Sequence, residues 1–447
     1  MQIATIILAA GKGKRLNSSI PKVMHTVGGI PLIGHITEVT QALNSNRNVV
    51  IVGENHKEIK KYLTSKSQNF EFIIQKQQLG TGHAVNCAAE NFKSFDGKLL
   101  ILYGDVPFIR KNTLNNLLAK IKTKNDLAVL GFTSNEPSDY GRLVINKDNN
   151  LEKIVEERDA TPEEKKINLC NSGIICGWSS AIFSFTSEIE NKNTASEFYL
   201  TDIIKISRQK NYRPIVVECI QEETKGINSR KDLAEAELNF QTVMRNNALE
   251  NGVSMIDPST VYFSYDTKIG KDTVIEPNVF FGLKVTIGNS SKIKAFSHLE
   301  GCTVSSGVQI GPFARVRPKT KLYDNTRVGN FVEIKNSTIG KFSKINHLSY
   351  VGDASIGQNT NIGAGTIFCN FNGVSKHHTN IGNNTFVGSN SSLIAPLEIG
   401  SGAMVGSGSV ITKNVPDDSL AVERNKQKIK LGLGKKIMNK FRTILEN

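Results

Sequence analysis

The sequence predicts an α/β domain joined by a helix to a parallel β-helix, and three observations lead to this fold class. Up to about residue 230, short apolar runs alternate with helix-like stretches, as in a parallel sheet covered by helices. Residues 231–251 then show a helical pattern. Beyond residue 252, aliphatic residues recur at every sixth position, which is typical of a hexapeptide β-helix.

The length of 447 residues favours two or three domains. No run approaches the roughly 18 apolar residues of a membrane span, and residues 1–10 lack the pattern of a signal peptide. We therefore expect a cytoplasmic protein without membrane insertion. The six cysteines are scattered and form no C-x-x-C pair, which indicates reduced, mostly buried thiols rather than zinc fingers or disulfides.

The formal net charge is +14, and half of it lies in residues 424–447, where eight Lys or Arg residues face one acid. Such a tail contacts phosphate ligands, a membrane surface or nucleic acid, or is simply solvated. The solvated tail is slightly favoured. Small polyanionic substrates account for the remaining charge, so no nucleic-acid partner is expected.

In the first domain the runs "NVVIVG", "FEFIIQ", "KLLILYGD" and "LAVLGF" are apolar on both faces, so we expect strands buried between helices. Ligands bind at the carboxyl ends of such strands, where "LAAGKGKR", "QLGTGHA" and "LYGDVP" fall. Gly11 and Gly13 let backbone N–H groups approach a phosphate, and Arg15 and Lys22 would neutralise charge on a triphosphate. Asp105 is then a natural Mg²⁺ ligand, the alternative being a turn cap.

The segment after residue 228 predicts a linker helix. Ser229 and Asp232 form a capping-box-like start, and Asn251 with Gly252 ends the helix. Between these ends the apolar residues with helical spacing are Leu233, Ala236, Phe240 and Val243.

The repeat of six begins after this helix, and a glycine often follows its aliphatic residue. In a β-helix the aliphatic side chain points into a prism-shaped core and the small neighbour fits a tight corner. The positions are Ile269, Ile275, Phe281, Ile287 and Ile293, and later Ile381, Val387, Leu393, Ile399, Val405 and Ile411. The segment "FCNFNGVSKHHTN" interrupts the repeat, which predicts a functional surface loop.

Five motifs of the first domain, in the order "LAAGKGKRL", "PKVMH", "QLGTGHA", "LYGDVP" and "YGR", look like those of sugar-nucleotide pyrophosphorylases. They precede "RVRP", "GNFVEIK", "HLSYVGD" and "NIGAGT" within the hexapeptide region. Together they make the chain resemble the family of bifunctional bacterial N-acetylglucosamine-1-phosphate uridyltransferases / glucosamine-1-phosphate N-acetyltransferases. The resemblance covers all but the last twenty or so residues, and the ordered set is highly specific.

The resemblance implies a Rossmann-like nucleotidyltransferase domain with a mixed, mainly parallel sheet at 1–230 and a linker helix at 231–251. It implies a left-handed β-helix acetyltransferase domain with a basic tail at 252–447. Such an enzyme acetylates glucosamine 1-phosphate with acetyl-CoA and then transfers UMP from UTP to the product, releasing pyrophosphate. The resulting UDP-N-acetylglucosamine supplies peptidoglycan and lipid A. A homotrimer with acetyl sites at subunit junctions is also implied.

The resemblance assigns one uridyltransferase site to the first domain. Its residues are Leu8, Ala9, Ala10, Gly11, Gln75, Gly80 and Thr81 for the nucleotide, Arg15 and Lys22 as catalytic cations on the phosphates, Tyr103, Gly104, Asp105 and Asn228 at the Mg²⁺ site, with Asp105 and Asn228 as ligands, and Gly141, Glu156 and Asn171 for the sugar.

Acetyl transfer from a thioester to an amine needs a base for the amine proton and a donor for the oxyanion. The base is predicted to be His347 in "HLSY". The other implied residues are Arg317 and Lys335 for the sugar phosphate, Tyr350 and Asn361 for the sugar, and Ala364, Asn370, Phe371, Ser389, Ser407 and Arg424 for acetyl-CoA.

Three features of the second domain depart from the family pattern or invite another role. The usual "CNYDG" is "CNFNG" here, so Phe371 and Asn372 lack a hydroxyl and a carboxylate. Ser407 replaces a usual alanine, a small change. His377 and His378 are adjacent and therefore poor joint metal ligands, so we expect surface residues.

Two alternatives stay open at this point. One is a sugar-nucleotide pyrophosphorylase whose β-helix is purely structural or regulatory, against which Arg317, Lys335 and His347 together argue. The other is a non-catalytic protein that binds sugar nucleotides or nucleic acid, against which Asp105 and Asn228 argue.

Overall fold

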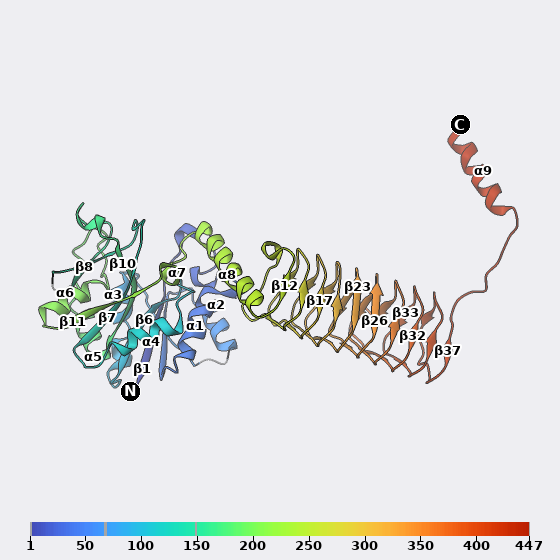
Figure 1. The fold of residues 1–447 in the computed structure, drawn as a ribbon, viewed down its shortest axis with the longest axis horizontal. Coiled ribbons are helices and arrows are strands. Elements are labelled where there is room, and N and C mark those ends of the chain that lie inside the picture. The colour runs from blue at the N-terminus through green and yellow to red at the C-terminus, as the bar shows by residue number, and fades with distance from the viewer. Residues whose placement is uncertain (1, 67–68, 148–149, 447) are drawn as a thin grey trace. The chain divides into compact units, whose positions relative to one another are not determined.

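The structure is a computed structural model that describes residues 2–66, 69–147 and 150–446. The chain divides into two units, residues 1–240 and 241–447, which are considered separately (Figure 1). The division falls inside the helix α8 (Arg230–Glu250).

A nine-stranded sheet forms the centre of the first unit. Its main path runs β11-β7-β10-β6-β1-β4-β5, and β8 and β9 form a hairpin attached to β10. Only β10 runs antiparallel to its neighbours on this path, β6 and β7. The sheet is therefore mixed and mainly parallel, as predicted. Its strands are β1 (Ile3–Ala9), β4 (Arg47–Val52), β5 (Glu71–Ile74), β6 (Lys98–Tyr103), β7 (Asp126–Thr133), β8 (Arg142–Ile145), β9 (Leu151–Val155), β10 (Leu169–Trp178) and β11 (Arg213–Cys219).

Helices cover both faces of this sheet (Figure 1). They are α1 (Leu32–Ala42), α2 (Lys57–Ser65), α3 (Thr81–Asn86), α4 (Lys111–Ala119), α5 (Ser179–Thr186), α6 (Asp202–Gln209) and α7 (Gln221–Thr224). Short 3₁₀ turns are η1 (Lys14–Leu16), η2 (Lys22–Met24), η3 (Ala89–Phe92) and η4 (Glu164–Lys166), and β2 (Thr26–Val27) pairs with β3 (Ile30–Pro31). The aliphatic residues of β4, β6 and β7 are buried, as predicted.

One strand differs from the prediction. The run "FEFIIQ" was expected to be buried on both faces, but β5 is the edge strand, and Ile74 is 43% exposed. The position of a strand in the sheet order depends on long-range pairing, which its own hydrophobicity does not encode.

In the second unit short strands form three parallel sheets, here called faces 1, 2 and 3. Face 1 contains β12 (Ser254–Met255), β14 (Val274–Ile275), β17 (Lys292–Ile293), β20 (Gln309–Ile310), β23 (Arg327–Asn330), β26 (Lys344–His347), β29 (Asn361–Ile362), β32 (Phe386–Val387), β35 (Met404–Val405) and β37 (Leu420–Ala421). Face 2 contains β13 (Lys268–Ile269), β16 (Thr286–Ile287), β19 (Cys302–Val304), β22 (Thr320–Leu322), β25 (Thr338–Ile339), β28 (Ala354–Ile356), β31 (Thr379–Ile381) and β34 (Leu397–Ile399). Face 3 contains β15 (Phe280–Phe281), β18 (His298–Leu299), β21 (Arg315–Val316), β24 (Glu333–Lys335), β27 (Tyr350–Gly352), β30 (Ile367–Cys369), β33 (Ser392–Ile394) and β36 (Val410–Ile411).

The hexapeptide repeat explains this architecture. Neighbouring strands pair residues one coil apart, for example Lys268 with Thr286, and three repeats of six make one coil. Aliphatic residues at the repeat positions, such as Ile293 and Val387, are fully buried. A Cβ on Gly288 would lie 2.7 Å from the carbonyl carbon of Ser305 in the next coil, so the small residue lets the coils stack closely.

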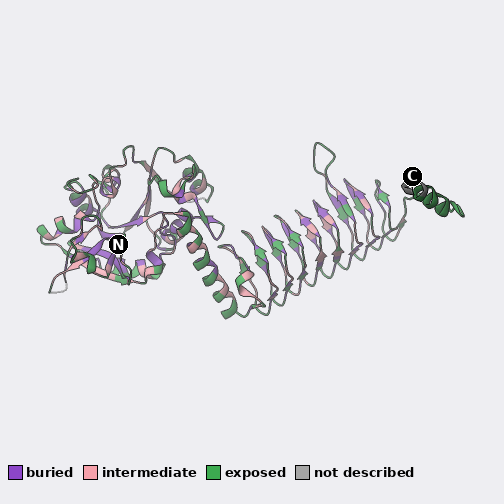
Figure 2. Cartoon of the chain, turned by 90° about the horizontal axis from the view of Figure 1, so that it is seen from above, coloured by how far each residue is buried: buried purple, intermediate pink, exposed green. Residues whose placement is uncertain are grey.

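Three further elements lie at the ends of the β-helix or interrupt its repeat. The turn η5 (Pro258–Thr260) precedes the regular coils. The interrupting segment forms a loop whose residues 371–376 are exposed (Figure 2). The chain ends in the helix α9 (Leu433–Glu446). Among the described residues, no helix is both long and apolar enough to cross a membrane.

The helix α8 starts and stops as its sequence predicts. The carboxylate of Asp232 accepts the backbone N–H of Ser229 (2.8 Å), and the Ser229 hydroxyl accepts the N–H of Asp232 (3.1 Å), which completes a capping box. Gly252 follows the last turn with φ +85°, a conformation that favours glycine. The predicted apolar face is wrong at Val243, which is 54% exposed, because Met244 and Ala248 face the core of the second unit instead.

Candidate active sites

Two cavities lie at the carboxyl ends of the central strands in the first unit. The larger, of about 620 Å³, brings together most residues predicted for the nucleotide: Leu8, Ala9, Ala10, Gly11, Arg15, Lys22, Gln75, Gly80, Thr81, Tyr103, Asp105 and Asn228. The other, of about 480 Å³, is lined by the three predicted sugar residues, Gly141, Glu156 and Asn171. Arg15, Tyr103, Asp105 and Asn228 line both cavities, so the two meet at the predicted metal site. Gly104 lies beside them, and its N–H donates to the Leu8 carbonyl (2.9 Å).

The loop after β1 presents its backbone to the larger cavity. No protein atom lies within 4 Å of the place where a Cβ on Gly11 would project, so a ligand can approach this backbone closely. Gly13 has φ +58°, and a Cβ there would lie 2.8 Å from the Cβ of Lys22. Lys12 and Lys14 line the cavity beside Arg15, so every cation of "GKGKR" surrounds it. This arrangement suits a polyphosphate.

The "QLGTGHA" loop is fixed by a second segment of the unit. Its Gly80 has φ +117°, and a Cβ there would lie 2.5 Å from the Phe198 carbonyl oxygen. Two backbone hydrogen bonds, from Gly82 to Phe198 (2.8 Å) and from Phe198 to Leu79 (2.8 Å), join the segments. The Gln75 amide nitrogen donates to the Gly80 carbonyl (3.1 Å), which orients this side chain at the cavity. The glycines therefore serve packing as well as ligand access.

The predicted metal ligands face one another across a cation. The Lys22 ammonium is ion-paired with Asp105 and donates to the Asn228 side-chain oxygen (2.5 Å). The two oxygens therefore converge on a positively charged group. A carboxylate and an amide oxygen that meet beside a phosphate-binding loop fit Mg²⁺, which takes few protein ligands and several phosphate or water oxygens. Among the described residues there is no cluster of three or more His, Cys, Asp or Glu side chains of the kind that holds a metal without substrate.

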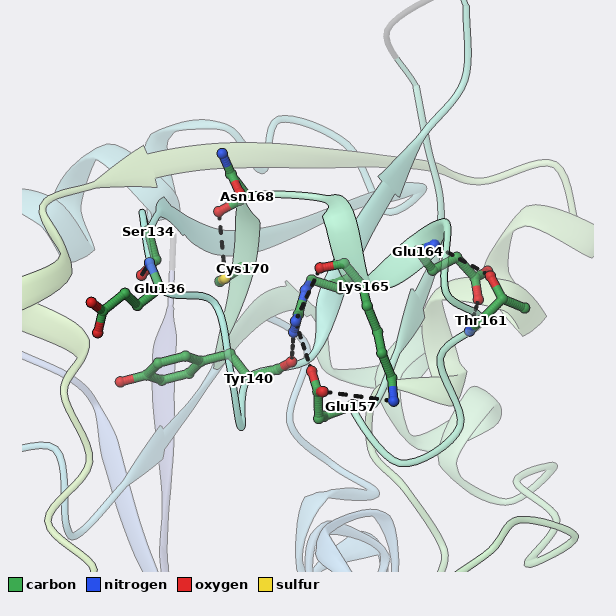
Figure 3. A network of polar contacts seen from close by, with 10 residues as sticks. Ser134, Glu136, Tyr140, Glu157, Thr161, Glu164, Lys165, Asn168 and Cys170 are labelled. Carbon is green, nitrogen blue, oxygen red and sulfur yellow. Dashed lines mark hydrogen bonds and ion pairs between the residues drawn. The ribbon is translucent and has the colours of Figure 1, made fainter.

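The sugar cavity is supported by an ion pair between the buried Arg142 and the half-buried Glu157 (Figure 3). Arg142, which is only 1% exposed, donates to Glu157 (2.7 Å) and to the Tyr140 carbonyl, and Lys165 lies 3.8 Å from Glu157. Figure 3 shows Tyr140, Glu157 and Lys165 converging at this pair. Because Arg142 and Glu157 directly follow Gly141 and Glu156, their pairing holds the cavity wall in place.

We expect Arg142→Met to lower the free energy of unfolding of the first unit by about 3 kcal/mol, because it leaves the Glu157 carboxylate without its buried partner. Urea unfolding followed by the fluorescence of Trp178, the one tryptophan, reports on this unit alone. Arg213→Met at the exposed start of β11 is the matched control and should change stability by less than about 0.5 kcal/mol. Equal stability of the two variants would contradict a structural role for the pair.

The remaining sugar residues have distinct environments. Burial raises the pKa of Glu156, opposed by a hydrogen bond from the Thr201 hydroxyl (3.1 Å). The Asn171 N–H donates to the Gly141 carbonyl (2.8 Å). Burial also raises the pKa of Tyr103, so its hydroxyl stays protonated. A Cβ on Gly173 would lie 2.7 Å from the Tyr103 ring, so this glycine makes room for the tyrosine.

Several residues that line the cavities were not identified from the sequence. Glu197 lines both cavities, and Tyr199 and Lys225 line the sugar cavity. They come from loops without periodicity, and only the tertiary fold brings them to the site.

In the second unit three of the predicted acetyl-CoA residues, Ala364, Ser389 and Ser407, form a row with His347 along one edge of the β-helix. Backbone hydrogen bonds link each coil to the next: Leu348 N–H to the Asn330 carbonyl (3.0 Å), Gly365 to His347 (3.2 Å), Asn390 to Ala364 (2.7 Å) and Gly408 to Ser389 (2.8 Å). We call this row the histidine edge; its members are Asn330, His347, Ala364, Ser389 and Ser407. The guanidinium of Arg424 donates to the Ser407 carbonyl (2.7 Å) at the end of the row.

The hydrogen bond of His347 defines which nitrogen is available. Its Nδ1 lies 2.7 Å from the side-chain oxygen of Asn330, one coil earlier. An oxygen acceptor places the proton on Nδ1, so Nε2 carries the free lone pair. The side chain is exposed and is therefore accessible to a substrate.

The predicted phosphate-binding residues lie on a different edge of the β-helix. His347 ends a strand of face 1, whereas Arg317 and Lys335 lie at the ends of face 3 strands. Strand pairing places Arg317 and Lys335 at the same position in successive coils, and Asp353 follows in the next coil; we call this row the lysine edge. Both cations line a cavity of about 320 Å³ together with Lys376 from the exposed loop. The adjacent Lys376 ammonium lowers the pKa of Lys335, as expected of a site that attracts anions.

Lys376 is a site residue that sequence reasoning missed, and the loop around it is ordered by the residues that depart from the family pattern. The side-chain oxygen of Asn372 accepts the N–H groups of Val374 (3.0 Å) and Ser375 (2.8 Å), and Phe371 pairs with Lys376. Asn372 therefore shapes the turn, and Phe371 is 58% exposed. In the sequence, the only sign that Lys376 belongs to a site is that its loop interrupts the hexapeptide repeat.

The rest of the predicted acetyltransferase residues do not share one cavity within a single chain. Asn370 donates to Asp353 and lies 3.5 Å from the Tyr350 hydroxyl. Asn361 instead lines a cavity with Arg327 and Lys344 on face 1. His377 and His378 bond to different partners, Asn372 (2.8 Å) and Ser355 (2.9 Å), and do not converge.

Two family models match the chain. Residues 5–163 match a MobA-like NTP transferase domain, and residues 378–413 match six repeats of the bacterial transferase hexapeptide. The fold and the two sites thus define a nucleotidyltransferase joined to a transferase of the left-handed hexapeptide β-helix type.

Similar proteins show which family within this class the chain belongs to. The "Bifunctional protein GlmU" of Paracoccus denitrificans is 47% identical over 440 residues, which cover 98% of each chain. That of Roseobacter denitrificans is 48% identical over 442 residues, covering 99% of this chain and 98% of the relative. The chain belongs to the GlmU family of bifunctional enzymes.

Proposed function

We propose that the first unit transfers UMP from UTP to N-acetylglucosamine 1-phosphate, and that the second acetylates glucosamine 1-phosphate with acetyl-CoA. The observation that carries this proposal is that each unit has its own site of suitable chemistry. The first unit has a cation-rich backbone loop facing a carboxylate. The second has an imidazole with a free Nε2 on one edge of the β-helix and a row of cations on another edge. Acetylation comes first, because its product is the sugar phosphate that the first unit consumes.

In uridyl transfer, a phosphate oxygen of N-acetylglucosamine 1-phosphate forms a bond to the α-phosphorus of UTP, and the bond from this phosphorus to the leaving pyrophosphate breaks. The reaction requires no nucleophilic side chain, so positioning and charge stabilisation provide the catalysis. Arg15 and Lys22 would neutralise the phosphates, and Gly141, Glu156 and Asn171 would orient the sugar at the adjoining cavity. Asp105 and Asn228 would hold Mg²⁺, which neutralises phosphate charge when bound.

In acetyl transfer, Nε2 of His347 would accept the proton of the substrate amine as nitrogen attacks the thioester carbon. The carbon–sulfur bond then breaks, and the proton returns to the CoA thiolate. Asn330 holds Nδ1 protonated and the ring in place. The sugar phosphate would bind Arg317, Lys335 and Lys376, since an anion relieves the repulsion between these cations.

We also propose a homotrimer acting in the cytoplasm. Within one chain the histidine edge and the lysine edge lie on opposite sides of face 3, and Asn361 lies elsewhere. A neighbouring copy would bring a second edge next to the first and complete the site. Sedimentation equilibrium giving the mass of three chains would support this assembly, and the mass of one chain would contradict it.

Two assays on the purified chain test the proposed activities. Glucosamine 1-phosphate with acetyl-CoA should release free thiol, and UTP with N-acetylglucosamine 1-phosphate and Mg²⁺ should release pyrophosphate. Pyrophosphate release without thiol release would favour a pyrophosphorylase with a purely structural β-helix. Absence of both would favour a binding protein.

The raised pKa of Glu156 gives a pH-dependent prediction. A carboxyl with a raised pKa binds its proton more tightly when folded, so wild-type stability decreases as pH rises through that pKa. Glu156→Gln keeps an oxygen for Thr201 but carries no charge. We expect a higher melting temperature than wild type at pH 7, an advantage that vanishes near about pH 4, and a KM for N-acetylglucosamine 1-phosphate raised about tenfold. A lower melting temperature at pH 7 would contradict this role.

A further inference from the structure

The C-terminal helix α9 (Leu433–Glu446) has two chemically different sides. Among its described side chains, the large apolar ones are all 38–61% exposed: Leu433, Ile437, Met438, Phe441 and Ile444. At 100° per residue these side chains occupy an arc of roughly 140°. The remaining arc carries the cations Lys435, Lys436, Lys440 and Arg442. Figure 2 shows the described residues of the helix as exposed.

The segment that leads into α9 has the same character. It adds Lys426, Lys428 and Lys430, and its apolar residues Ile429 and Leu431 are 75% and 95% exposed. The proposed activities use Arg424 but no residue beyond it. The basic, amphipathic residues 425–446 therefore have no role in either proposed active site.

The two sides of α9 indicate which kind of partner would bind the helix. Nucleic acid would neutralise the cations but leave the apolar arc in water. A second copy of α9 would cover the apolar arc but bring like charges together. An anionic lipid surface would bind both sides of the helix. The apolar side chains would be buried among the acyl chains, while the ammonium and guanidinium groups would contact the lipid phosphates.

We propose that residues 425–446 adsorb the enzyme to anionic phospholipid surfaces, with α9 lying in the plane of the interface. The helix does not span the bilayer: it has fourteen residues and a charged side, whereas a span needs about twenty apolar residues. Adsorption would hold both catalytic units at the surface of a membrane without inserting them.

The test is co-sedimentation of the full-length chain with vesicles at physiological salt. Phosphatidylcholine vesicles containing phosphatidylglycerol should bind the chain, and pure phosphatidylcholine vesicles should bind it at least about tenfold more weakly. Two variants separate apolar burial from charge. Phe441→Glu and Asn439→Glu each add one negative charge, but only the first removes an apolar side chain. We expect about tenfold loss of binding for Phe441→Glu and less than about threefold for Asn439→Glu, with both enzymatic activities unchanged.

Three outcomes would overturn the proposal. Equal weakening by the two variants would show that charge alone drives binding, as for nucleic acid. Binding to an RNA oligonucleotide that survives Phe441→Glu, without vesicle binding, would identify the tail as a nucleic-acid segment. Absence of vesicle binding together with an increased KM for acetyl-CoA on removing residues 432–447 would assign the helix to the acetyl site.

Discussion

Asp105→Asn is expected to reduce UMP transfer by at least about a thousandfold. The substitution keeps the size of the side chain but removes the charge that pairs with Lys22 at the predicted cation site. Lys22 then loses its ion pair, and Mg²⁺ loses its carboxylate ligand. Pyrophosphate release from UTP and N-acetylglucosamine 1-phosphate measures the effect, and varying the Mg²⁺ concentration should recover little of the rate.

Acetyl transfer should be unaffected by Asp105→Asn, because the change lies in the other unit. The matched control is Asp96→Asn, at a carboxylate that binds Lys124 (3.0 Å) and Trp178 away from both cavities. That variant should retain full UMP transfer. Normal activity of the Asp105 variant would refute the assigned metal site.

His347→Ala is expected to reduce acetyl transfer by about a hundredfold to ten-thousandfold, the usual contribution of a positioned general base. Without the imidazole no group on the histidine edge takes the amine proton, since Ala364, Ser389 and Ser407 bear no base. Thiol release from acetyl-CoA measures the effect. The rate of the variant should rise with pH, as more substrate amine becomes deprotonated in solution.

The control for this variant is His378→Ala. His378 lies on the exposed loop, bonded to Ser355 (2.9 Å), and should be dispensable. If both variants released thiol at the wild-type rate, His347 would not be the base and the row of residues around it would be structural.

Much of this protein could be predicted from local patterns. The repeat of six determines the β-helix because each aliphatic side chain must be buried at a fixed corner of the coil. His347, Ala364, Ser389 and Ser407 lie on one edge because each follows a paired face 1 strand by the same offset, although their spacing in the sequence is uneven. In the first unit, motifs at strand ends converge because parallel strands end at the same side of a sheet. Their order in the chain therefore predicted most of the nucleotide cavity.

Residues that depend on tertiary contacts could not be predicted in this way. Asn330 lies in the motif "GNFVEIK", but its contact with His347 depends on the stacking of successive coils. Lys376 lies where the repeat is broken, so its register has no pattern. Glu197 reaches both cavities from an irregular loop. The edge position of β5 and the exposure of Val243 likewise follow from which element packs alongside, and the sequence of either segment carries no such information.

The central claim is that one chain contains two independent active sites that act in succession. It is tested most directly by supplying glucosamine 1-phosphate, acetyl-CoA, UTP and Mg²⁺ and measuring UDP-N-acetylglucosamine. Neither Asp105→Asn nor His347→Ala alone should form product at an appreciable rate, whereas a mixture of the two variants should form it, because the acetylated intermediate diffuses from one to the other. A mixture as inactive as its components would contradict the account.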